Sequence, residues 1–284
     1  MYKNKFLVGT AALAALVLGA CGDGESSSEE KAKIDLAYVE WDTEVASTHV
    51  VGHVLEDMGY DVTLIPLDNA IMWEAVAKGE ADAMVAGWLP ATHAAQYEKY
   101  GSDAVDLGPN LDGAKIGLVV PSYMDVNSIN DLTTETNKTI TGIEPGAGIM
   151  AATEKALTEY DNLADWTLQS SSSGAMTVAL NQAIQNEEDI IVTGWSPHWK
   201  FASYDLKYLE DPQGVYGGAE SIHTFVRKGL EDDLVEAYNM LDAFNWTVED
   251  VEAVMVDIQG GMKPEEAAKK WVEANSSVVE SWKK

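Results

Sequence analysis

The sequence predicts an α/β fold, and the order of its apolar segments supports this class. Short apolar runs that end in turn residues, typical of buried strands, span residues 34–41, 61–68, 81–88, 115–121, 139–146 and 190–197. Amphipathic stretches that fit helices lie between them, at residues 47–59, 69–80 and 148–160. Strands that alternate with helices in this way indicate βαβ units and a mainly parallel sheet.

The start of the chain predicts a secretory signal peptide over residues 1–20. Lys3 and Lys5 precede an apolar run, and small residues lead to Cys21, in an ending that resembles a bacterial lipobox. Cys21 would then be the lipidated first residue of the mature protein, although an incidental cysteine near an ordinary cleavage site is the alternative. Residues 21–33 are otherwise small, polar and charged, and we expect a flexible tether.

No later segment approaches the roughly 20 uninterrupted apolar residues of a membrane span. We therefore expect a protein that a lipid anchor holds to the extracellular face of the cell membrane. The formal net charge of −29 argues against a nucleic-acid partner, because phosphates would be repelled. The same charge favours solubility and fits an external saline medium.

The order of the segments predicts two lobes. Residues 122–132 follow a strand and open a new series of strands and helices, and the chain is helical after residues 214–229. We expect lobe 1 to comprise residues 34–121 and 219–284, and lobe 2 to comprise residues 122–218. One continuous doubly wound domain is the alternative.

Three tryptophans, Trp41, Trp88 and Trp195, end predicted strands. Ligands of open α/β sheets bind beyond the carboxyl ends of the strands, so these rings are expected to face one cleft between the lobes. Indole rings around a cavity suit a quaternary ammonium, and each ring contributes about 0.5 to 2 kcal/mol. Core packing is the alternative for each ring, and it is the preferred interpretation for Trp73, Trp166, Trp246, Trp271 and Trp282.

A glycine-rich turn at residues 142–150 leads into a helix expected to begin near Ile149. The free amides of Gly148 and Ile149 are candidate donors to an anion. His93, close after Trp88, is a candidate further donor. In the alternative, the glycines only make a tight turn and His93 is a surface residue at a helix start. The turn is not a nucleotide fingerprint, since the GxGxxG pattern fails.

An anion site opposite an aromatic cage predicts a small zwitterion with a quaternary nitrogen. The one arginine, Arg227, lies outside these motifs, so backbone amides rather than an arginine fork are the expected carboxylate partners. His49 and His53 have the spacing of metal ligands on a helix, but no third ligand accompanies them and no metal is expected. No cofactor is expected, and the chain lacks a nucleophile elbow, so we predict a non-enzyme.

Four motifs resemble the substrate-binding lipoproteins of glycine betaine and proline betaine ABC importers: VEWD at 39–42, GWLPATH at 87–93, GIEPGAGIM at 142–150 and GWSPHW at 194–199. The resemblance covers residues 34–284. It implies a two-lobed periplasmic binding protein fold of type II that closes on its ligand like a hinge.

The resemblance also implies residue roles and partners. The aromatic cage would comprise Trp41, Trp88 and Trp195, and the carboxylate would meet the amides of Gly148 and Ile149 together with His93. The partners would be a betaine, a membrane permease and a separate ATPase, since this chain has no P-loop. Alternatives are a binding protein for choline, carnitine or a sulfonium betaine, an enzyme acting on a quaternary amine, and a non-transporting sensor or structural lipoprotein.

Overall fold

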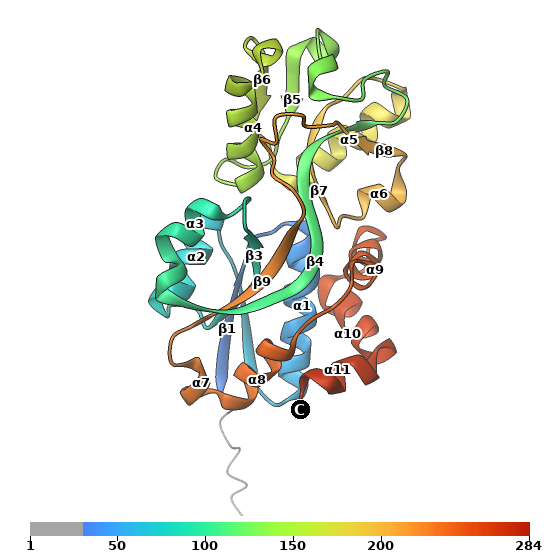
Figure 1. The fold of residues 1–284 in the computed structure, drawn as a ribbon. Coiled ribbons are helices and arrows are strands. Elements are labelled where there is room, and N and C mark those ends of the chain that lie inside the picture. Colours follow the sequence, from blue (N-terminus) through green and yellow to red (C-terminus); the bar gives the residue numbers. More distant parts are fainter. Residues whose placement is uncertain (1–30) are drawn as a thin grey trace, which may run out of the picture. The chain divides into compact units, whose positions relative to one another are not determined.

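The computed structural model describes residues 31–284 (Figure 1). The predicted signal peptide, Cys21 and most of the predicted tether lie outside the described residues. Among residues 31–284, no helix has the length and apolar character needed to cross a membrane.

The first sheet has the strand order β2-β1-β3-β9-β4. Its strands are β1 (Lys33–Tyr38), β2 (Asp61–Pro66), β3 (Ala83–Leu89), β9 (Glu220–Arg227) and β4 (Ala104–Pro121). Strand β1 is parallel to β2 and β3, whereas β9 is antiparallel to both β3 and β4. This sheet is the centre of what we call lobe 1.

The second sheet continues from the distal half of β4, with the order β4-β7-β5-β6. The added strands are β5 (Thr139–Thr141), β6 (Thr167–Gln169) and β7 (Val192–Ser196), and β8 (Leu206–Tyr208) pairs with the end of β4. Strand β5 is parallel to β6 and β7, and β4 is antiparallel to β7 and β8. This sheet is the centre of lobe 2.

Strand β4 connects the two lobes (Figure 1). It pairs with β9 up to Ala114 and with β7 from Lys115 onward, so one strand serves both sheets. The return passage leads from lobe 2 into β9. The lobe limits predicted from the sequence, 121/122 and 218/219, fall at the end of β4 and just before β9, and they stay a prediction.

The helices of the amino-terminal and middle segments are α1 (Asp42–Asp57), α2 (Asn69–Lys78), α3 (Ala94–Tyr100), α4 (Gly148–Glu159), α5 (Ser173–Asn186) and α6 (Lys200–Ser203). Short 3-10 turns span Gly101–Asp103, Ile129–Asp131, Glu135–Lys138 and Asp161–Leu163. Helix α2 ends where Gly79 takes a left-handed conformation with φ of 70°, which glycine adopts at little cost.

The carboxyl-terminal helices are α7 (Leu230–Asp233), α8 (Val235–Ala243), α9 (Val248–Gln259), α10 (Pro264–Ala274) and α11 (Ser276–Trp282). Helix α9 begins at a capping box, in which Thr247 Oγ1 accepts from the Asp250 amide and Asp250 accepts from the Thr247 amide. Helix α10 has proline at its first position, where no amide hydrogen is required.

Aromatic side chains from the carboxyl-terminal helices form part of the core. The rings of Trp271 and Trp282 stack with centroids 5.9 Å apart, and Phe244 packs edge-on against Trp282 at 5.1 Å. The predicted burial is confirmed for all five tryptophans assigned to the core, which are Trp73, Trp166, Trp246, Trp271 and Trp282.

The α/β class is confirmed, but the expectation of a mainly parallel sheet is wrong. Pairing is parallel in the outer strands and antiparallel wherever β4 or β9 takes part. The sequence did not predict β6, β8, β9 or the first half of β4. In β4, Gly108 and Pro109 are turn-forming residues, and here they lie at register shifts within a continuing strand.

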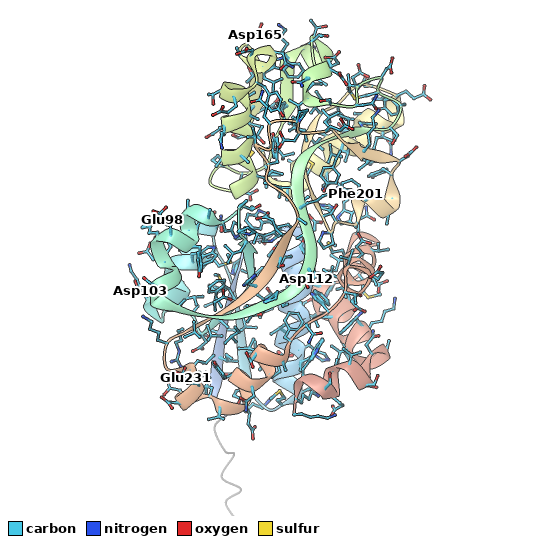
Figure 2. All side chains as sticks on the ribbon, in the orientation of Figure 1. Glu98, Asp103, Asp112, Asp165, Phe201 and Glu231 are labelled. Atoms are coloured by element: carbon cyan, nitrogen blue, oxygen red, sulfur yellow. The ribbon has the colours of Figure 1, made fainter. Side chains whose placement is uncertain are left out.

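Acidic side chains are distributed over both lobes (Figure 2). Glu98, Asp103 and Glu231 in lobe 1 and Asp165 in lobe 2 are exposed at the periphery of the described unit. The negative charge of the chain is therefore carried largely by solvated surface, which favours solubility.

Candidate functional site

A small cavity of about 20 Å³ lies between the lobes. It is lined by Trp41, Trp88, Thr92, His93, Ile116, Ile143, Ala147, Gly148, Ile149 and Trp195. All six ligand-contact residues predicted from the sequence are among these ten. No residue of this lining carries an acidic, lysine or arginine side chain.

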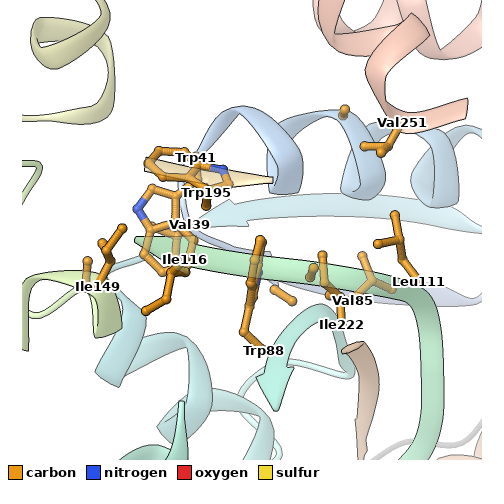
Figure 3. Close-up of a cluster of buried hydrophobic side chains, with 14 of the residues drawn as sticks. Val39, Trp41, Val85, Trp88, Leu111, Ile116, Ile149, Trp195, Ile222 and Val251 are labelled. Atoms are coloured by element: carbon orange, nitrogen blue, oxygen red, sulfur yellow. The ribbon is translucent and has the colours of Figure 1, made fainter. Parts of the chain in front are cut away.

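The three predicted cage tryptophans reach the cavity from different elements (Figure 3). Trp88 and Trp195 are the penultimate residues of β3 and β7, as expected for strand ends. Trp41 does not end its strand, because β1 stops at Tyr38 and Trp41 is the N-cap of α1. Each tryptophan is at most 6% exposed, so the rings form enclosed walls.

The indole N–H of each cage ring donates a hydrogen bond to another residue of the protein. Trp88 Nε1 donates to Glu44 Oε1 over 2.6 Å, and Trp195 Nε1 donates to Thr43 Oγ1 over 3.0 Å. Trp41 Nε1 donates to a carboxylate oxygen of Glu144 in lobe 2. Because these polar atoms are engaged, the rings offer aromatic carbon to the cavity, and their orientation is fixed.

Glu44 is a buried carboxyl behind the cage. Burial raises its pKa from the ordinary 4.5 to about 8; the hydrogen bond from Trp88 opposes this shift, and the charges of Asp42 and Glu144 reinforce it. Its second oxygen, Oε2, has no hydrogen-bond partner within residues 31–284. The raised pKa favours the uncharged form of Glu44 as the acceptor for the Trp88 indole.

The lining also includes the amino-terminal end of α4, with Ala147 as N-cap. The first amides of a helix have no partner within the helix, and the dipole of the helix favours negative charge there. In the described part of the chain, the amides of Gly148 and Ile149 donate to no protein group. These two N–H groups are free to bind an anion in the cavity.

Gly148 also allows the lobes to approach each other. A Cβ atom at this position would lie 2.1 Å from the carbonyl oxygen of Thr92 in lobe 1, a distance at which atoms overlap. Only glycine fits this contact between the start of α4 and the segment after β3.

His93 is the N-cap of α3 and is fully buried. Its Nδ1 accepts the Trp88 amide hydrogen over 3.1 Å. Burial lowers the pKa of the ring to about 3, and the nearby Ala86 carbonyl opposes this shift only in part. The ring is thus neutral and carries its proton on Nε2, which makes no hydrogen bond to the residues described. The alternative of a surface histidine is excluded.

Glu220 of β9 holds the turn that carries Thr92 and His93. Its Oε1 accepts the amides of Ala91 and Thr92 over 2.6 and 2.8 Å, and Oε2 accepts the Thr92 hydroxyl. A buried carboxylate with these donors fixes one wall of the cavity.

The remaining candidates lie away from the cavity. Arg227 pairs with Asp82 at 2.6 Å and with Asp233 at 2.8 Å within lobe 1. His49 and His53 lie on α1, and no group of three or more metal-ligating side chains occurs among residues 31–284. Cys21 lies outside the described residues.

Sequence reasoning missed the apolar lining of Ile116, Ile143 and Ala147, and it missed the supporting residues Thr43 and Glu44. The apolar residues look like ordinary core in sequence. The two supporting residues follow the VEWD motif directly, so their position in the first turn of a helix after Trp41 was the available signal.

Comparison with known proteins points to one family. The family model described as "Substrate binding domain of ABC-type glycine betaine transport system" matches residues 32–274. The glycine betaine/carnitine transport binding protein GbuC of Listeria monocytogenes is 52% identical over 156 residues, which are 54% of this chain and 51% of that relative. The chain thus aligns with about half the length of this curated relative.

Two solved structures are similar over nearly the whole described unit. Lactococcal OpuAC, in its closed-liganded conformation complexed with glycine betaine, is 59% identical with a TM-score of 0.88, over 89% of this chain and 100% of that one. The glycine betaine, L-proline-binding protein ProX of Borrelia burgdorferi is 36% identical with a TM-score of 0.86, over 89% and 97% of the two chains. The chain therefore has the two-lobed binding-protein fold and belongs to the family of substrate-binding domains of ABC-type glycine betaine transport systems.

Proposed function

We propose that this protein captures glycine betaine outside the cell and delivers it to an ABC importer for osmoprotection. The observation that carries the proposal is one cavity in which three indole walls face two free helix amides, without a charged side chain in the lining. Such a cavity has a binding group for the cationic end of a zwitterion and another for the anionic end, so an ion of a single sign would leave one of these groups unused.

The trimethylammonium group is assigned to the cage of Trp41, Trp88 and Trp195. A quaternary nitrogen has no hydrogen to donate, so it loses little when it leaves water for a site without acceptors. Each ring attracts the cation through its quadrupole by about 0.5 to 2 kcal/mol. A neutral Glu44 fits this assignment, because the cage then requires no buried anion behind it.

The carboxylate is assigned to the amides of Gly148 and Ile149 and to His93 Nε2. All three donors line the same cavity, and all lack a partner among the described residues. Without a ligand carboxylate they would remain buried and unpaired, at a cost of about 1 to 3 kcal/mol each. This cost disfavours choline, which has no carboxylate.

The family implies the partners of the protein. Closed, ligand-bound protein would dock on a membrane permease whose transport a separate ATPase drives, and lipidated Cys21 would hold the protein on the outer face of the membrane. We place the hinge in β4 and in the segment before β9. It joins lobe 1, residues 34–121 and 219–284, to lobe 2, residues 122–218. The change of strand pairing at Lys115 supports this position.

Isothermal titration calorimetry with glycine betaine tests the proposal, with choline, proline and glycine as comparison ligands. We expect saturable binding of glycine betaine, weaker binding of choline and none of glycine. Trp88→Ala and Trp195→Ala should lose the binding while keeping the far-ultraviolet circular dichroism of the parent. Trp246→Phe changes a buried tryptophan outside the cavity and serves as the matched control.

Two results would contradict the assignment. If glycine betaine gave no heat and no change of tryptophan fluorescence, the ligand would be wrong. If choline bound as tightly as glycine betaine, the amides of Gly148 and Ile149 would not be carboxylate donors.

A further inference from the structure

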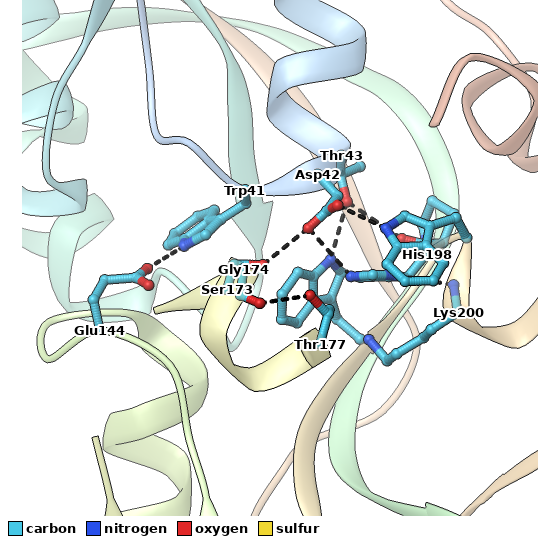
Figure 4. A network of polar contacts seen from close by, with 12 residues as sticks. Trp41, Asp42, Thr43, Glu144, Ser173, Gly174, Thr177, His198 and Lys200 are labelled. Carbon is cyan, nitrogen blue, oxygen red and sulfur yellow. Dashed lines mark hydrogen bonds and ion pairs between the residues drawn. The ribbon is translucent and has the colours of Figure 1, made fainter. Parts of the chain in front are cut away.

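The first turn of α1 lies at the junction of the two lobes (Figure 4). Helix α1 packs against β1, β2 and β3 and against α9 and α10, so it belongs to lobe 1. Its first residue, Asp42, does not line the cavity. The Asp42 side chain instead points toward lobe 2, between the start of α5 and the segment after β7.

Both carboxylate oxygens of Asp42 meet groups of lobe 2. Trp199 Nε1 donates to Oδ1 over 2.7 Å, and Ser173 Oγ donates to Oδ2 over 2.9 Å. His198 Nε2 lies 3.4 Å from Oδ2. Its Nδ1 accepts the Lys200 amide hydrogen, so a neutral ring carries its proton on Nε2, toward Asp42.

These contacts keep Asp42 ionised. Burial alone would raise the pKa of the carboxyl, but its contacts with His198, Trp199 and Ser173 outweigh burial and hold the pKa well below its usual range. Hydrogen bonds to a charged acceptor are roughly twice as strong as those between neutral groups. In addition, the fully buried Lys200 Nζ has no hydrogen-bond partner in the described chain. Burial lowers the pKa of this amine to about 7, and the negative charge of Asp42 opposes that shift.

The stretch of lobe 2 that includes His198 and Trp199 also includes Trp195, which lines the cavity. Trp195 lies three residues before His198, and their rings pack edge to face at 4.7 Å. Thr43 receives the Trp195 indole hydrogen and donates to the Pro197 carbonyl over 3.3 Å. Asp42 and Thr43 thus join lobe 1 to the part of lobe 2 that places Trp195 against the ligand.

We propose that Asp42 is a positioning residue that latches the lobes closed by accepting hydrogen bonds from Trp199 and Ser173 of lobe 2, with His198 Nε2 at 3.4 Å. The inference rests on the proposed function insofar as closure is what retains the ligand. Both donors and His198 lie across the lobe junction, so an open protein would expose the carboxylate to water instead. A contact made only in the closed state adds to the closed population and therefore slows ligand release.

The test compares Asp42→Ala with Asp106→Ala in the purified protein. Asp106 is the matched control, since its carboxylate meets a histidine, His223, at 2.9 Å within lobe 1 and its side chain is 29% exposed, as is that of Asp42. We expect Asp42→Ala to raise the dissociation constant and the dissociation rate of radiolabelled glycine betaine about 10- to 100-fold. The association rate should change little, and Asp106→Ala should leave all three values as in the parent.

A double-mutant cycle separates a latch from a merely structural role. Trp199→Phe removes one donor and should weaken binding in the parent but not in Asp42→Ala, because the partner is already gone. Additive effects of the two changes, a dissociation constant for Asp42→Ala within about twofold of the parent, or an equal loss in Asp106→Ala would overturn the proposal.

Small-angle scattering distinguishes this failure from failure of the proposed function. If the parent protein bound no betaine, the ligand assignment would fail, and the latch would be judged by compactness alone. A parent that is more compact than Asp42→Ala would then support the latch. Equal radii of gyration would overturn it.

Discussion

Replacing Glu44 by glutamine is expected to stabilise the protein at pH 8 much more than at pH 5. The buried carboxyl accepts the Trp88 indole hydrogen and has no partner for its other oxygen within residues 31–284. Glutamine keeps the accepting oxygen and nearly the same shape, but it cannot ionise. The comparison therefore isolates the effect of the Glu44 proton.

The magnitude follows from the raised pKa of Glu44. Between the ordinary value of 4.5 and about 8, the unfolded chain releases this proton while the folded protein keeps it. The folded state then binds more protons, so the free energy of unfolding falls as pH rises through this window, by about 1.4 kcal/mol per pH unit. From pH 5 to pH 8 the loss due to Glu44 is about 4 kcal/mol, and Glu44→Gln should not show it.

Urea unfolding followed by circular dichroism at several pH values measures this difference. Other titrating groups contribute equally to both proteins, so they cancel when the stability of Glu44→Gln is compared with that of the parent at each pH. We expect the variant to gain on the parent steadily from pH 5 to pH 8. A constant difference across this range would refute the conclusion that Glu44 is held neutral.

Four further results are expected. The Cβ of Gly148→Ala would overlap the Thr92 carbonyl, so this variant should bind glycine betaine about 10- to 100-fold more weakly. The melting temperature of the ligand-free protein should not fall. An unchanged affinity would contradict this reasoning. His93→Ala should weaken binding about 10-fold. Because burial lowers the pKa of His93 to about 3, the affinity of the parent should show no step near pH 6.5 in calorimetry. Trp282→Ala, which removes a buried ring from Phe244, should cost about 3 to 5 kcal/mol in urea unfolding, and a loss below about 1 kcal/mol would contradict that packing.

Local pattern was enough to predict the α/β class and a set of residues that the fold brings to one cavity. The periodicity of the apolar residues located β2, β3 and β7 and the helices α1, α2 and α4, because each signal lies within a few neighbouring residues. The antiparallel pairing of β4 and β9 was not predictable in this way. Their direction depends on the chain leaving lobe 1 and returning to it, which no single segment records.

The site residues also fall into two groups, those that the local sequence indicated and those that it did not. Trp88, Trp195 and the Gly148 turn were found because ligands of open sheets bind where strands end and helices begin. Their supporting residues were not found, since Glu220 holds a turn that lies 128 residues earlier in the chain and Asp42 meets Trp199, which lies 157 residues later. Contacts at such separations follow from the fold and not from local sequence.

The sequence by itself determined a set of candidate residues for a quaternary zwitterion, which stays a prediction: three tryptophans at turns, a glycine-rich helix start and no arginine among these motifs. Only the tertiary structure decided how those residues are held and charged. Burial raises the pKa of Glu44 and lowers that of His93, whereas the polar contacts of Asp42 lower the pKa of its carboxyl. The physical reason is that a side chain's pKa and orientation depend on the solvent and partners around it, and folding brings those partners together from both lobes.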